Sequence, residues 1–161
     1  MSLRYALAAR EITSRRSDLV FLQECEAAFF DAAWNSAAPT LLQEYELFPC
    51  RVSHTAGGEE PGTAILVRQL GRAVAIAKAP VCIGGTKETG GQSKVATVLP
   101  VRVGDLRDVI AVSTHFTWDG ASEARLYHAQ LLGNELRTRH NPIILVVYFS
   151  CQPVPTPKAF E

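Results

Sequence analysis

The sequence lacks an excess of charge of either sign. Its 161 residues carry 16 Lys and Arg against 16 Asp and Glu, so the formal net charge is zero. This balance argues against a polybasic arm for nucleic acid or a membrane surface, although it leaves room for a local basic cleft. No apolar run reaches the roughly 18–20 residues of a membrane-spanning helix. We therefore expect a soluble protein with no membrane partner.

Cysteines at metal-binding spacing are also lacking. The four cysteines are scattered and form no C-x-x-C pair: Cys25, Cys50, Cys82 and Cys151. Their even number would allow disulfides, but no hydrophobic signal peptide directs the chain to an oxidising compartment. We expect reduced, buried thiols and an intracellular, cytoplasmic protein. Residues 1–16 contain Arg and Ser and leave a mitochondrial presequence open, although Leu3, Leu7 and Ile12 have the spacing of a surface helix.

The rest of the composition is that of an ordinary globular domain, with 47% hydrophobic and 20% charged residues. Periodicity predicts helices over residues 3–15, 26–34, 39–44 and 121–138. It predicts strands over 19–22, 46–52, 63–68, 72–77, 93–103, 108–114 and 143–149, with a hairpin link at Asp105. Residues 19–22 and 143–149 are almost continuously apolar, which is typical of strands buried on both faces. Many strands and few helices indicate an α/β sandwich of packed sheets.

The helix over 121–138 is expected to bury one apolar face and to leave its charged residues to solvent or a cleft. The predicted face comprises Leu126, Ala129, Leu132, Gly133 and Leu136. The charged set comprises Arg125, Glu135 and Arg137. We expect three histidines at the surface: His54, His128 and His140.

Two polar residues stand at the ends of predicted strands. Glu24 follows the apolar residues 19–22, and His115 follows Val112-Ser113-Thr114. A carboxylate at a strand end suits a hard cation, because the sheet holds it in position. Taken alone, Glu24 is more simply interpreted as a solvated glutamate at a strand end, and His115 is equally well interpreted as a structural histidine.

The order of the segments resembles the endonuclease/exonuclease/phosphatase superfamily, which has a deoxyribonuclease-I-like fold. The family's Leu-Gln-Glu strand end matches Leu22-Gln23-Glu24, and its Gly-x-Ala-Ile strand matches residues 62–65. Its Thr-His-Leu strand matches Thr114-His115-Phe116, and its Arg-x-x-Gln helix resembles residues 125–130. Pro-Ile-Ile-Leu, before the family's Gly-Asp-Phe-Asn, matches residues 142–145. The details look closest to the nocturnin and deadenylase branch, over nearly all of residues 10–161.

The resemblance implies a Mg²⁺-dependent phosphoester hydrolase acting on RNA or nucleotides. Glu24 would bind Mg²⁺, and the metal would neutralise charge that develops on the phosphate. His115 would donate hydrogen bonds to the same phosphate. Arg125 is a candidate for substrate binding, with an exposed helical arginine as the alternative.

The chain departs from the family where water is activated. Tyr148 and Ser150 stand at the positions of the family's Asp and Asn, and Val147 stands at that of its Gly. Tyrosine, with an ordinary pKa near 10, is a poor base at neutral pH and a poor ligand for a hard cation. The family's first-strand Asn falls upstream of Met1 and its last Asp-His pair beyond Glu161, and Ser93 stands where an Asn is usual. The resemblance thus implies a domain over 1–161 that is incomplete at both ends.

These departures predict an inactive or severely impaired enzyme. The alternative is a non-catalytic RNA- or protein-binding module on the decayed fold. A sequence error at Tyr148 and Ser150, or a longer product that completes the site, also remains open. The sequence does not indicate an oligomeric state.

Overall fold

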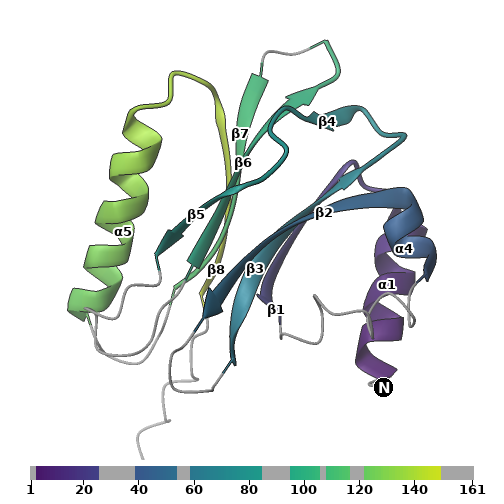
Figure 1. Cartoon of the computed structure of the whole chain (residues 1–161), viewed down its shortest axis with the longest axis horizontal. Helices are drawn as coiled ribbons and strands as arrows, with labels where there is room; N and C mark the ends of the chain where they lie inside the picture. The colour runs from purple at the N-terminus through teal and green to yellow at the C-terminus, as the bar shows by residue number, and fades with distance from the viewer. Residues whose placement is uncertain are drawn as a thin grey trace, which may run out of the picture.

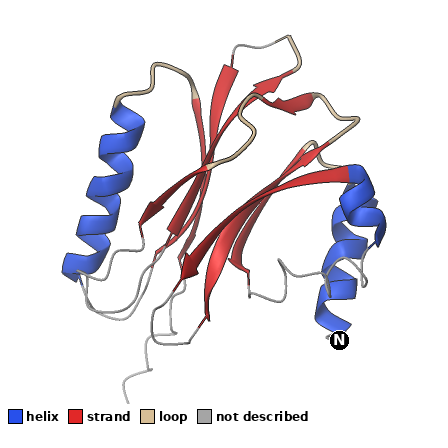
Figure 2. Ribbon diagram, in the orientation of Figure 1, coloured by secondary structure: helices blue, strands red, loops and turns tan. Residues whose placement is uncertain are grey.

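The computed structural model describes residues 3–25, 39–53, 59–84, 95–105, 108–116 and 122–149. Two β-sheets lie face to face, with helices on their outer sides (Figures 1 and 2). The helices α1 (Leu3–Arg15) and α4 (Pro39–Glu44) cover one sheet, and α5 (Ser122–Arg137) covers the other. The predicted α/β sandwich is confirmed in this part of the chain.

The first sheet has three antiparallel strands in the order β1-β3-β2. These are β1 (Leu19–Cys25), β3 (Glu59–Arg68) and β2 (Tyr45–Ser53). The second sheet has the order β4-β6-β7-β8, and β5 also pairs with β6. Its members are β4 (Ala73–Ala75), β6 (Val95–Val103), β7 (Asp108–Phe116), β8 (Ile143–Phe149) and β5 (Val81–Gly84). The predicted hairpin joins β6 to β7, whereas β8 runs parallel to β7.

The central strand β3 shows how the layers form. Its Ala64 and Leu66 pack in the cluster that contains residues of α1 and α4, whereas Ile65 and Val67 pack between the two sheets. Successive side chains of a strand point to opposite faces, so a continuously apolar strand serves two cores at once. A third cluster joins the second sheet to Leu132 of α5. The packing accounts for the apolar strands that the sequence contains.

The two strands expected to be buried on both faces are edge strands. In β1, Val20 and Leu22 face the helix layer while Leu19 and Phe21 face the other sheet, but all four are only partly buried. For β8 the prediction of burial is wrong, because Ile143, Ile144 and Leu145 are 40–47% exposed. Among the described residues, β8 has a strand on one side alone, which leaves its other side open.

The helix over 121–138 is confirmed as α5, and its predicted inward face is confirmed at Leu132 and Leu136 but wrong at Leu126, Ala129 and Gly133, which are exposed. Leu126 is 59% exposed, whereas His128 is buried and only 7% exposed. The residues turned toward the sheet follow an i, i+3, i+4, i+8 spacing that starts at His128 and includes Leu131, Leu132 and Leu136. The surface position expected for His128 is therefore wrong. His128 packs on Phe116, with the ring centroids 5.3 Å apart.

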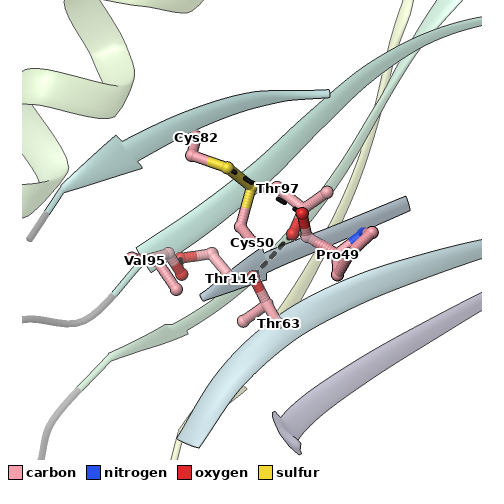
Figure 3. Close-up of a disulfide and its surroundings, with 7 residues drawn as sticks. All are labelled: Pro49, Cys50, Thr63, Cys82, Val95, Thr97 and Thr114. Atoms are coloured by element: carbon pink, nitrogen blue, oxygen red, sulfur yellow. Dashed lines mark hydrogen bonds between the residues drawn. A yellow bond between two sulfur atoms is a disulfide. The ribbon is translucent and has the colours of Figure 1, made fainter. Parts of the chain in front are cut away.

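The expectation of four reduced thiols is wrong for two of them. Cys50 on β2 and Cys82 on β5 form a disulfide that joins the two sheets (Figure 3). Cys25 is free and buried, and burial raises the pKa of its thiol to about 12. The two bonded cysteines are 32 residues apart in sequence, so their proximity follows from the stacking of β2 and β5.

Several expectations fall on residues that the structure does not describe. They concern the helix over 26–34, His54, Ser93, Ser150 and Cys151. His140 is exposed, as expected. Among the described helices, none has the length and apolar character needed to cross a membrane.

Candidate functional site

A line of paired side chains runs across the three strands of the first sheet and across β5, β6 and β7 of the second. Cys50 of β2 is registered with Thr63 of β3, and Cys82 of β5 is registered with Thr97 of β6 and, through it, with Ser113 of β7. Each of these residues pairs with a residue of the opposite sheet. We call this line the transverse row; its pairs are Cys50–Cys82, Thr63–Thr97 and Gln23–Ser113.

The transverse row holds the sheets together by different kinds of bond. The hydroxyl oxygens of Thr63 and Thr97 are 2.7 Å apart, and both side chains are buried (Figure 3). The amide of Gln23 donates to the hydroxyl of Ser113 at 2.9 Å. Buried polar groups are retained where they are paired, because an unpaired one costs about 1–3 kcal/mol. The row therefore fixes the lateral position of one sheet on the other.

A β-bulge in β1 places Glu24 beside this row. Leu22 pairs with Ala64 and Cys25 pairs with Gly62, so Gln23 and Glu24 together oppose a single residue of β3. Glu24 has a φ of 53°, in the left-handed region that a residue with a Cβ seldom adopts. Its side chain is 47% exposed. The bulge thus turns a carboxylate out of the ladder, and such strained positions are frequent at functional sites.

His115 of β7 faces this carboxylate. Its Nε2 lies 3.5 Å from Oε1 of Glu24, and its side chain is only 4% exposed. His115 is two residues beyond Ser113, so both side chains project from the same face of β7. A buried imidazole from one sheet and a half-exposed carboxylate from the other therefore meet at one end of the sandwich.

Tyr148 is the third member of the group. It is registered with His115 across the parallel pair β7–β8, and the two ring centroids are 5.1 Å apart at an interplanar angle of 56°. Tyr148 is 44% exposed. The structure thus brings together three positions singled out from the sequence, namely Glu24, His115 and Tyr148. Ser150 lies outside the described residues, and Arg125 is placed only by its backbone, in the first turn of α5.

The donor set at this site is small. Within the described residues, no cluster of three or more His, Cys, Asp or Glu side chains could hold a metal ion. Mg²⁺ is commonly bound through one or two carboxylates, with water and substrate phosphates completing its shell. The half-exposed carboxylate of Glu24 fits that mode, as a single protein ligand.

Two residues of the site were not identified as functional from the sequence. Gln23 belongs to the Leu-Gln-Glu segment, which predicts a role for Glu24 alone, and the pattern around Ser113 predicts only a strand. The available signal was the period of two that places Ser113 on the same face as His115. Their contact with each other had no sequence signal, because they are 90 residues apart.

The two stacked sheets, the outer helices and the polar group at one end define a two-sheet α/β sandwich. No family model matches the chain, and no curated protein matches it in sequence. Solved structures do match. ANGEL2, described as a 2′,3′-cyclic phosphatase, superposes with a TM-score of 0.69 at 14% identity, over 87% of this chain and 41% of that chain.

Two further structures support the same fold. The human nocturnin catalytic domain with bound sulfate gives a TM-score of 0.64 at 21% identity, covering 89% of this chain and 55% of that chain. An endonuclease/exonuclease/phosphatase from Beutenbergia cavernae DSM 12333 gives 0.57 at 17% identity, covering 88% and 40%. At these identities the likeness establishes the fold. The resemblance predicted from the motifs is thus confirmed at the level of the fold, and the chain spans about half of each of these proteins or less.

Proposed function

We propose that this chain binds phosphate esters of RNA or nucleotides at the Glu24–His115 pair and hydrolyses them, if at all, at a severely reduced rate. The observation that carries the proposal is the 3.5 Å approach of these two side chains, which come from different sheets. The sulfate in the nocturnin structure and the cyclic phosphatase description of ANGEL2 support a phosphate ligand for this fold.

Each residue has a defined part in this proposal. Glu24 holds Mg²⁺, which when bound neutralises charge on the phosphate. His115 donates a hydrogen bond from its ring to a phosphate oxygen, at a buried position where such bonds are strong. Arg125, in the first turn of α5, remains a candidate for binding the substrate.

Tyr148 accounts for the expected loss of rate. It stands against the His115 ring, and the resemblance puts a water-activating aspartate at its position in the sequence. A phenol neither accepts a proton readily at neutral pH nor binds Mg²⁺ well. The loss of a general base costs about 10²–10⁴-fold in rate. We expect hydrolysis to be slower than that of nocturnin by a factor in this range.

The test compares this chain with the nocturnin catalytic domain on poly(A) RNA, adenosine 2′,3′-cyclic phosphate and NADPH, with Mg²⁺ and with a chelator. The variant Tyr148→Asp with Ser150→Asn should raise turnover by about 10²-fold or more, and Glu24→Gln should abolish the gain. Glu46→Gln is the matched control, because Glu46 is an exposed carboxylate on β2 of the same sheet. Turnover by the unmodified chain at the rate of nocturnin, lost in Glu24→Gln, would refute the proposed impairment.

A non-catalytic binding module is the second candidate, and the exposure of β8 favours it. Ile143, Ile144, Leu145 and Tyr148 are each at least 40% exposed on one edge strand. Apolar residues gathered at a surface mark sites of association. This candidate predicts binding of RNA or protein that needs no Mg²⁺ and survives Glu24→Ala. Titration of Mg²⁺ with and without that substitution separates the two functions.

A further inference from the structure

A single buried hydroxyl connects the strand of His115 to the two residues that precede Glu24. The Ser113 hydroxyl donates to the backbone oxygen of Leu22 at 3.1 Å and accepts from the Gln23 amide at 2.9 Å. Ser113 has no exposed surface. One side chain of β7 therefore holds β1 at its bulge, directly before the carboxylate.

The bulge is where β1 has least support from its own sheet. β1 is an edge strand, and its regular pairing with β3 is interrupted between Leu22 and Cys25. The left-handed backbone of Glu24 lies inside this interruption. Such a conformation persists only where the surroundings impose it. The two hydrogen bonds of Ser113 are contacts from the opposite sheet that reach this point.

We propose that Ser113 and Gln23 form a lock across the sheets that sets the distance between Glu24 and His115. Ser113 is then a positioning residue, because it acts on the phosphate site through the placement of Glu24. The functional part of this inference rests on the proposed binding of phosphate, whereas the structural part does not.

The neighbouring pair in the transverse row supplies a matched control. Thr63 and Thr97 also form a buried hydroxyl contact between the sheets, at 2.7 Å, but they belong to β3 and β6. Thr97→Val removes that bond at nearly constant volume. If these bonds only strengthen the packing of the two sheets, Ser113→Ala and Thr97→Val should have the same effect on the Glu24–His115 contact. If Ser113 and Gln23 position Glu24, Ser113→Ala alone should change that contact.

The first measurement needs no ligand. The ring signals of His115 are recorded by NMR, assigned through a His115→Gln variant, and compared before and after Glu24→Gln. We expect Glu24→Gln to shift these signals in the unmodified background, in Thr97→Val and in Ser113→Thr, which keeps the hydroxyl. In Ser113→Ala the shift should fall by about half or more. A full shift in Ser113→Ala would overturn the lock.

The second measurement is the affinity for inorganic phosphate in the presence of Mg²⁺. The loss of one hydrogen bond of ordinary strength corresponds to a weakening of about 2–13-fold, so Ser113→Ala should weaken binding by that factor. Thr97→Val should leave the affinity unchanged. Ser113→Ala and Glu24→Gln combined should weaken binding no more than Glu24→Gln does, and additive effects would count against the lock.

The two measurements distinguish a failure of the lock from a failure of the proposed function. If no phosphate binds but the NMR shift depends on Ser113, the proposed function is wrong and the lock stands. If phosphate binds with equal affinity in Ser113→Ala, the lock has no functional role. Should Ser113→Ala fail to fold, Gln23→Leu removes one of the two bonds while Ser113 remains bonded to Leu22, and the same outcomes apply.

Discussion

Removing the Cys50–Cys82 bond should destabilise the protein by a predictable amount. The bond joins β2 to β5 across a sequence separation of 32 residues. For a loop of that length, the lost entropy of the unfolded chain corresponds to about 3.5–4 kcal/mol at 25 °C. Unfolding entropy per residue, applied to a chain of this length, converts this to a fall in Tm of about 10 °C. Since domains are typically stable by 5–15 kcal/mol, the bond supplies a large part of the total.

The assay is thermal unfolding followed by circular dichroism, with and without reductant. Cys82→Ser is the preferred variant, because Cys82 is exposed while Cys50 is fully buried and a hydroxyl there would add a desolvation cost. It should unfold about 10 °C lower than the unmodified protein and should no longer respond to reductant. Cys25→Ala is the control, since Cys25 is a free thiol, and its response to reductant should remain complete.

Two results would refute this reasoning. One is a thiol titration of the unfolded, unreduced protein in which all four cysteines react. The other is a reductant-induced change in Tm of less than about 2 °C, which would mean that the bond constrains the unfolded chain far less than its loop length predicts.

Three further predictions concern other parts of the fold. Burial lowers the pKa of His128, so the unfolded chain binds more protons below pH 6.5 and the free energy of unfolding should fall as the pH drops from there. Urea unfolding at pH 7.5 and 5.5 should show a smaller fall in this free energy for His128→Phe than for the unmodified protein. Equal falls in the two proteins would contradict this prediction. The Arg68 guanidinium donates to Asp18 at 2.7 Å and lowers the pKa of that carboxyl. Arg68→Met should therefore reduce stability at pH 7, with the difference from the unmodified protein shrinking below about pH 3.8; a difference that stays constant to pH 3 would exclude this ion pair as its source. Leu145→Lys, on the exposed edge strand β8, should lower light scattering at high protein concentration and should change the free energy of unfolding by less than about 0.5 kcal/mol. Unchanged scattering would show that this edge does not drive association.

Much of the fold follows from local pattern. The alternation and runs of apolar residues located the strands β2, β3, β6, β7 and β8, and the hairpin at Asp105. The short strand β5 was not predicted, because its four residues follow Pro80 and lead into a glycine-rich segment. Glu24 and His115 stood out for the same local reason, since each is a polar side chain at the end of an apolar strand.

The wrong predictions for α5 and β8 have a common cause, because the burial of a side chain depends on neighbours that are distant in sequence. Histidine is not an apolar residue, so the pattern of α5 did not indicate that His128 faces the sheet. The composition of β8 is that of a buried strand, but its place at the edge of the sheet leaves it exposed.

The features of the site likewise divide into those that local sequence predicts and those that depend on the tertiary structure. Residue types and strand ends are local properties, and they sufficed to single out Glu24, His115 and Tyr148. The contact of Glu24 with His115, the Ser113–Gln23 bonds and the Cys50–Cys82 disulfide each join one sheet to the other. Such contacts depend on how two sheets stack and on the register within each, which are set by packing over the whole core. No local pattern encodes them.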